Sequence, residues 1–118
     1  MKCYANPNWR DLPLRPSTRY FLEHLSNLEF DHPIKYVLLF GSEAKGIANA
    51  LSDVDISVVS DKPLTRKDRV LVNEQIDAAA GNTDYQLVYT TVDKLTTSNT
   101  LDVNFSINAE GVLLYERA

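Results

Sequence analysis

Two aspartates, Asp53 and Asp55, stand one residue apart at the start of a mostly apolar run, 54–59. Side chains alternate between the faces of a β-strand, so a strand here places both carboxylates on one face, with Cα atoms roughly 6.5 Å apart. Carboxylates at that spacing repel each other, and a divalent cation between them removes the repulsion. Mg²⁺ prefers hard oxygen ligands and commonly takes one or two carboxylates together with phosphate oxygens. The pair therefore predicts a magnesium site.

A Gly-Ser pair, Gly41 and Ser42, follows the apolar run YVLLF and precedes Asp53 by ten intervening residues. A glycine after a buried strand allows a tight turn and a close approach by a ligand. Backbone N–H groups at the start of a helix favour an anion, and the Ser42 hydroxyl adds a hydrogen-bonding group. One turn can thus hold phosphates while the neighbouring strand holds the metal, which is the arrangement that phosphoryl and nucleotidyl transfer require.

The elements that must position these residues can be read from the periodicity of apolar side chains. Ser17 is a plausible helix N-cap, and Thr65 and Asp68 have capping-box spacing, with Gly81 placed to end that second long helix. The pattern predicts helices at 17–28, 44–51 and 65–80, and strands at 34–40, 54–59, 83–91 and 112–116. Residues 101–107 fit a strand or a helix equally well. This order indicates a small α/β layer fold.

The composition limits the size of the protein and the class of its partners. The chain has 118 residues, which is the size of one domain, and its net charge of −4 and pI of about 5.0 argue against a nucleic-acid or anionic-membrane binder. The basic cluster TRKDR at 65–69 is interpreted as a solvated first helical turn. The lone Cys3 offers neither a disulfide framework nor a zinc site. With no signal core and no apolar run of about 18 residues, we expect a cytoplasmic protein.

Residues 1–16 carry three prolines and are expected to form an irregular N-terminal arm. Trp9 and Leu12 could anchor this arm to the body. Residues 17–118 are then expected to form a single domain.

The segment GSEAKGIANALSDVDI resembles the signature of the DNA polymerase beta-like nucleotidyltransferase superfamily in its minimal, stand-alone form. That signature is Gly-Ser, about ten residues, then Asp-x-Asp, often with Ala-Arg-Gly inside the gap. The resemblance extends over roughly residues 17 to 116. It implies an α+β two-layer fold with a small mixed sheet, similar to the palm of polymerase beta.

The resemblance implies a third carboxylate on a later strand, completing a site for two Mg²⁺ ions and acting as general base. Asp84, at the start of the strand predicted at 83–91, is where the resemblance places it, with Asp93 and Asp102 as lower-ranked alternatives. Asp53, Asp55 and Asp84 would therefore be both the catalytic residues and the metal ligands. Gly41 and Ser42 would hold the phosphates of ATP.

Two further residues are candidates for the nucleotide site. Lys45 stands where the family often has Arg, so it can meet a phosphate as a point charge but not through a bidentate contact. Ser52 could cap or orient Asp53. Ordinary structural roles stay open: a plain exposed lysine, a strand-to-helix turn at Gly41 and Ser42, and a strand-start cap at Asp84. His24 and His32 lack spaced partners and are interpreted as structural.

The function implied by the resemblance is Mg²⁺-dependent transfer of AMP from ATP to an acceptor hydroxyl. Many minimal members of the family, the MntA-like proteins of the HEPN/MNT type, are antitoxins that pair with a HEPN toxin, and some add AMP to a tyrosine of it. We therefore expect a HEPN-type partner and a hetero-oligomer. The alternative is a non-catalytic nucleotide-binding module that masks its partner stoichiometrically. Transfer to a small molecule such as an antibiotic is a third idea, but such enzymes usually carry an added helical domain.

Overall fold

The computed structural model describes residues 9–30, 34–41, 53–97 and 111–117, and the account below concerns these residues. In chain order the elements are η1 (Trp9–Asp11), α1 (Pro16–Ser26), β1 (Ile34–Phe40), β2 (Val54–Ser60), α3 (Arg66–Ala80), β3 (Tyr85–Thr91), α4 (Val92–Thr97) and β4 (Val112–Glu116). The helix predicted at 44–51 and the ambiguous segment 101–107 lie outside the described residues.

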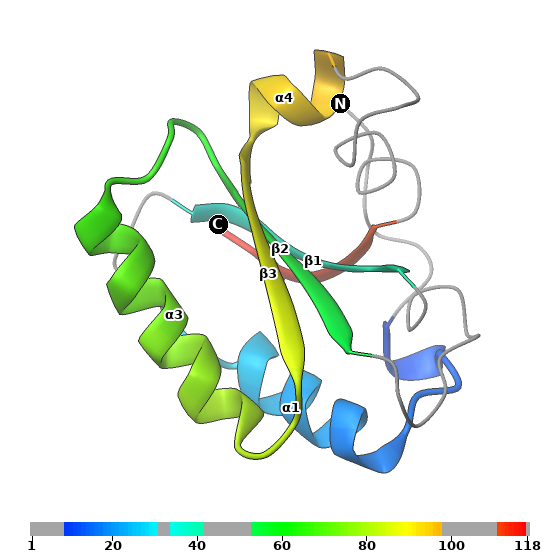
Figure 1. Ribbon diagram of the computed structural model, residues 1–118. Helices are drawn as coiled ribbons and strands as arrows, with labels where there is room; N and C mark the ends of the chain where they lie inside the picture. Colours follow the sequence, from blue (N-terminus) through cyan, green and yellow to red (C-terminus); the bar gives the residue numbers. More distant parts are fainter. Residues whose placement is uncertain (1–8, 31–33, 42–52, 98–110, 118) are drawn as a thin grey trace.

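The four strands form one mixed sheet in the order β3-β2-β1-β4. β1 is antiparallel to both β2 and β4, whereas β2 and β3 are parallel and are joined through α3 (Figure 1). A parallel pair needs such a crossover, because a tight turn can only reverse the chain. The predicted fold class, a two-layer α+β fold with a small mixed sheet, is confirmed.

One face of the sheet is covered by α1 and α3, and the main core lies between these two helices and the sheet. Apolar residues recur at helical spacing on both helices, so each helix has an apolar side. That side packs against alternate residues of the strands. The fully buried members of this cluster include Phe21, Leu22, Leu25, Val72 and Ile76 from the helices and Val37, Leu39, Val54, Ile56 and Val58 from β1 and β2.

The opposite face is not covered by α1 or α3 and is called the open face for that reason alone; it carries a smaller apolar cluster of buried residues. It consists of Tyr36, Leu38, Phe40, Val59 and Leu95, with Leu95 contributed by α4. α4 lies at the end of β3, at the top of Figure 1. Strand alternation places the odd-numbered residues of β2 on this face, since Val59 belongs to its cluster and Val58 to the main core.

The N-terminal prediction was right about anchoring and wrong about the helix start. Trp9 is 3% exposed within the main core, and Leu12 packs against it. However, the N-cap of α1 is Arg15, which makes no side-chain capping bond, and not Ser17. Pro16 explains the difference, because its fixed φ and missing N–H suit the first position of a helix. The helix also ends at Ser26, two residues before the predicted end at Leu28.

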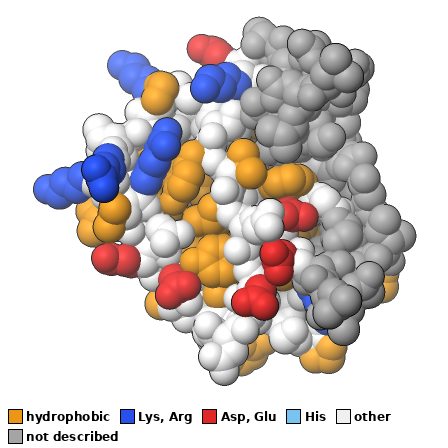
Figure 2. Space-filling model, in the orientation of Figure 1, with side chains coloured by type: hydrophobic (Ala, Val, Ile, Leu, Met, Phe, Trp, Pro, Cys, Tyr) orange, Lys and Arg blue, Asp and Glu red, His pale blue; other side chains and the backbone are white. Residues whose placement is uncertain are grey.

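The second long helix and its caps match the prediction. Thr65 Oγ1 accepts a hydrogen bond from the Asp68 backbone N–H at 3.1 Å, and Gly81 caps the other end with a positive φ of 60°. The basic cluster at 65–69 begins this helix, and Arg66, Lys67 and Arg69 are exposed. Figure 2 shows Lys and Arg gathered over this part of the molecule.

α4 (Val92–Thr97) is not among the helices that the sequence pattern predicts. The Lys94 backbone N–H donates to Thr91 Oγ1 at 3.4 Å, so a threonine side chain caps the first turn of this helix. None of the described helices is both long and apolar enough to span a lipid bilayer.

Candidate functional site

Asp53 and Asp55 lie at the start of β2 and are both half-buried. They share the odd-numbered register of β2, so they face the open side of the sheet rather than α1 and α3. Asp55 is paired with Phe40 on β1 and with Gln86 on β3. The two carboxylates therefore stand between two neighbouring strands, where the backbone fixes their position.

Gly41 ends β1 in close contact with Asp55. Its φ is +74°, a conformation that residues with a side chain rarely adopt. A Cβ atom built on Gly41 would overlap Asp55 Oδ2. The chain thus leaves β1 directly against a carboxylate, and only glycine provides the room.

The electrostatics of the pair are unfavourable without a partner cation. Burial raises the pKa of Asp55 above its ordinary value, and the nearby charge of Asp53 raises it further. Both effects disfavour the ionised form, and both would be offset by a bound divalent cation. Two carboxylates supply the hard oxygen donors that suit Mg²⁺, which also retains water or phosphate ligands.

Gln86 is a site residue that the sequence analysis missed. It lies beside Asp55 on the parallel strand, and its Nε2 donates to Asp53 Oδ2 at 3.1 Å. The signal was present in the strand alternation: Tyr85 and Leu87 pack in the main core, so Gln86 must face the open side with the aspartates. An amide does not match the third carboxylate that the family resemblance implies, so the resemblance does not point to Gln86.

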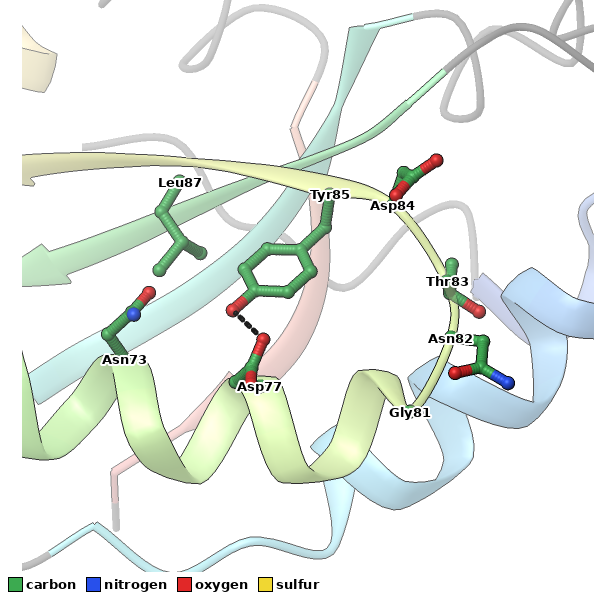
Figure 3. Close-up of a pocket in the computed structure, with 8 residues that line it drawn as sticks. All are labelled: Asn73, Asp77, Gly81, Asn82, Thr83, Asp84, Tyr85 and Leu87. Carbon is green, nitrogen blue, oxygen red and sulfur yellow. Dashed lines mark hydrogen bonds between the residues drawn. The ribbon is translucent and has the colours of Figure 1, made fainter.

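Asp84 lies next to this group and, unlike the half-buried Asp53 and Asp55, is exposed. Its backbone carbonyl accepts a hydrogen bond from Val54 N–H at 3.0 Å, which ties it to the start of β2. Its side chain is exposed and points away from α3 (Figure 3). Within the described ranges, no three His, Cys, Asp or Glu side chains gather closely enough to hold a metal ion. The role of Asp84 as third carboxylate stays a prediction.

A pocket of about 590 Å³ lies on the other side of Asp84, toward α3. It is lined by Asn73, Asp77, Gly81, Asn82, Thr83, Asp84, Tyr85 and Leu87 (Figure 3). The Tyr85 hydroxyl donates to Asp77 Oδ1 at 3.0 Å, and burial, together with this bond to Asp77, raises the pKa of Tyr85 to about 12. Tyr85 faces the helices, so this pocket and the aspartate pair lie on different faces of the sheet.

The remaining predicted site residues are not all placed. Ser42, Lys45 and Ser52 lie outside the described residues, as does Asp102. Asp93 lies in the first turn of α4 and is exposed. The structure therefore brings together Gly41, Asp53 and Asp55, adds Gln86, and places Asp84 at their edge.

Comparison with known proteins gives one family and several similar folds. Residues 23–118 match the family described as polymerase beta, nucleotidyltransferase. No curated protein matches the chain in a sequence search.

Several solved structures resemble the chain at low sequence identity. A chain of a toxin–antitoxin complex with AMP-PNP is 22% identical, with a TM-score of 0.52 and coverage of 86% of this chain and 72% of the other. The complex of a tri-AMPylated Shewanella oneidensis HEPN toxin with its MNT antitoxin gives 19% identity, a TM-score of 0.52 and coverage of 86% and 73%. A candidate nucleotidyltransferase from Sulfolobus solfataricus is 19% identical to this chain, with a TM-score of 0.52. The match covers 86% of this chain and 84% of the other.

At these identities the solved structures establish the fold alone. An MNT antitoxin is among the proteins with a similar fold. The family match is broader, because it spans most of the chain and includes the strand that carries Asp53 and Asp55. The chain belongs to the polymerase beta nucleotidyltransferase family.

Proposed function

We propose that this protein is a Mg²⁺-dependent nucleotidyltransferase that moves AMP from ATP to a hydroxyl of a HEPN-type partner protein. The observation that carries the proposal is the placement of Asp53 and Asp55 on one sheet face, with Asp55 against Gly41. Family membership supports nucleotidyl transfer in general. The AMP-PNP complex and the AMPylated HEPN toxin among the similar folds support the choice of nucleotide and acceptor.

Each residue has a defined role in this proposal. Asp53 and Asp55 would hold the Mg²⁺, and Gly41, which has no side chain to displace Asp55, would let that carboxylate keep its position. Asp53, Asp55 and Asp84 would be the carboxylates of a site for two Mg²⁺ ions, and such ions would supply charge stabilisation to the phosphates as pyrophosphate leaves. Ser42 and Lys45 would contact the phosphates, and Ser52 would orient Asp53.

Asp84 is proposed as the general base that takes the proton of the acceptor hydroxyl. Its exposed side chain at the edge of the pair would be reachable by a partner protein. The acceptor would come from that partner in a cytoplasmic hetero-oligomer.

A non-catalytic module that masks its partner is the second candidate. The observation that favours it is Gln86, because the side chain closest to the pair on β3 is an amide and not a third acid. In that case the protein would bind ATP and Mg²⁺ without transferring AMP.

The deciding experiment incubates the protein with ATP labelled on the α-phosphate, Mg²⁺ and a lysate of its native host. Label on a discrete protein band supports nucleotidyl transfer, and the same reaction with γ-labelled ATP should leave that band unlabelled. The double variant Asp53→Asn/Asp55→Asn should abolish labelling. Glu74→Gln, which removes one exposed carboxylate on α3, is the matched control and should label normally.

The other outcomes separate the two candidates. ATP binding that requires Mg²⁺, without any transfer, would favour the masking module. Absence of both ATP binding and transfer would contradict both candidates.

A further inference from the structure

Gln86 is the one polar residue of β3 that is hydrogen-bonded to the aspartate pair among the described contacts. Its backbone is in register with Asp55, and its side-chain amide reaches Asp53 Oδ2 at 3.1 Å. Val88, two residues further along β3, packs in the apolar cluster of the open face, so Gln86 shares that face. A single side chain thus connects the two strands at the site.

The chemistry of an amide differs from that of a carboxylate at this position. The N–H of Gln86 satisfies one lone pair of Asp53 without adding charge. A carboxylate offers about four acceptor sites on two oxygens, so Asp53 keeps acceptor capacity for a cation. Hydrogen bonds of this kind orient a metal ligand, and their loss typically weakens metal binding about 10- to 100-fold.

We propose that Gln86 is a positioning residue for Asp53, and that the pair so held takes one divalent cation before nucleotide binds. The inference rests on the proposed function, since it concerns the same site. Two carboxylates carry two negative charges, which one divalent cation neutralises. A second divalent cation would leave an excess positive charge in a half-buried site. The phosphates of ATP bring the additional negative oxygens that a second cation needs.

Asp84 is the competing candidate for a further ligand in the nucleotide-free protein. Its side chain is exposed and points away from α3, and among the described residues no three acidic side chains gather closely enough to hold one metal ion. The inference therefore predicts that removing the Asp84 carboxylate leaves cation binding unchanged.

The test is a titration of the nucleotide-free 118-residue protein with Mn²⁺, monitored by electron paramagnetic resonance and by melting temperature. Wild type should bind one Mn²⁺, and Asp53→Asn should abolish that binding. Gln86→Ala should weaken it about 10-fold or more. Asp84→Asn should bind as wild type does.

Gln86→Glu provides a second readout that does not depend on activity. It replaces the donor by a third carboxylate, so the metal-free protein should melt at a lower temperature. Mn²⁺ should then raise the melting temperature more than in wild type, with an altered resonance spectrum. Gln75→Glu is the matched control, because Gln75 lies on α3 and its side-chain amide donates to the Glu29 carbonyl at 3.0 Å, away from the aspartate pair. It should leave Mn²⁺ binding and spectrum unchanged.

The results separate this inference from the proposed function. Wild type that binds no Mn²⁺ would overturn both. If Asp53→Asn abolishes Mn²⁺ binding but Gln86→Ala and Gln86→Glu bind Mn²⁺ as wild type does, only the role of Gln86 would be overturned. Loss of binding in Asp84→Asn, or two Mn²⁺ ions bound without nucleotide, would overturn the single-cation site.

Discussion

Gly41 and Asp55 touch so closely that no side chain can be added to the glycine without displacing the carboxylate. Asp55 lies on β2 and pairs with Phe40 of the antiparallel strand β1, and Gly41 is the residue after Phe40. The contact links Gly41, directly after β1, to the strand that carries the aspartate pair, and it can be tested directly.

Gly41→Ala should lower stability and weaken cation binding together. A side chain at φ +74° costs on the order of 1–3 kcal/mol, and the added methyl group would push Asp55 from its place. Gly81→Ala is the matched control: Gly81 also has a positive φ, of 60°, but nothing lies within 4 Å of its added Cβ. Urea denaturation and Mn²⁺ titration of both variants provide the measurement. Equal losses of Mn²⁺ affinity in the two variants would contradict the contact.

Asp55 should make the metal-free protein less stable as the pH rises. Its pKa is raised in the folded state, so between the ordinary value of 3.8 and the raised value the folded protein binds more protons than the unfolded chain. The free energy of unfolding therefore falls as pH increases through that window. Asp55→Asn should flatten this dependence and be more stable than wild type at neutral pH without metal. Melting temperatures of both proteins, measured from pH 3 to 8 in the presence of a chelator, test this expectation. With excess Mg²⁺ in place of the chelator, wild type should become the more stable of the two.

Tyr85→Phe should cost about 1 kcal/mol at neutral pH, through loss of the hydrogen bond to Asp77. The ring would still pack against Phe21, whose ring centroid lies 5.6 Å away. Because the pKa of Tyr85 is raised to about 12, the wild type should lose stability as pH rises from 10 to 12, and the variant should lose less. Denaturation at pH 7 and pH 11 tests both points. Tyr20→Phe, at a 66% exposed position, should change little.

Ser57→Ala should stabilise the protein by about 1 kcal/mol. Ser57 is fully buried on β2, and within the described part of the chain its Oγ has no hydrogen-bond partner. Ser60, also buried on β2, donates to the Lys62 carbonyl at 2.6 Å, so Ser60→Ala should destabilise by a similar amount. Opposite signs in thermal denaturation are expected. A loss of stability in Ser57→Ala would indicate that its hydroxyl has a partner after all.

Local patterns predicted most of the fold. The strand at 34–40 and the last strand at 112–116 have the predicted bounds, and the Thr65 cap has the predicted partner. These features depend on side-chain alternation and on short-range hydrogen bonds, which the sequence encodes directly. The start of α1 was missed because Pro16 outweighed the capping preference of Ser17.

The site was predicted where it depends on neighbours in sequence and missed where it depends on pairing between strands. The spacing of Asp53 and Asp55 fixes their common face, whatever the rest of the chain does. The proximity of Gln86 to Asp53 depends on the parallel register of β2 and β3, and that register is set by the packing of α3. The sequence of β3, YQLVYTT, does not by itself determine which residue of β2 lies opposite Gln86.

The parallel pairing of β2 with β3 also governs how the site comes into being during folding. Asp53 and Gln86 meet across 33 residues of chain, so the bond between them forms only after α3 has closed over the sheet. Contacts of such sequence separation carry a loop-closure cost and tend to form late. β1 and β2 can pair earlier, which places Gly41 against Asp55 before the third strand arrives. In refolding, the contact between Gly41 and Asp55 should therefore precede the capacity to bind a cation tightly.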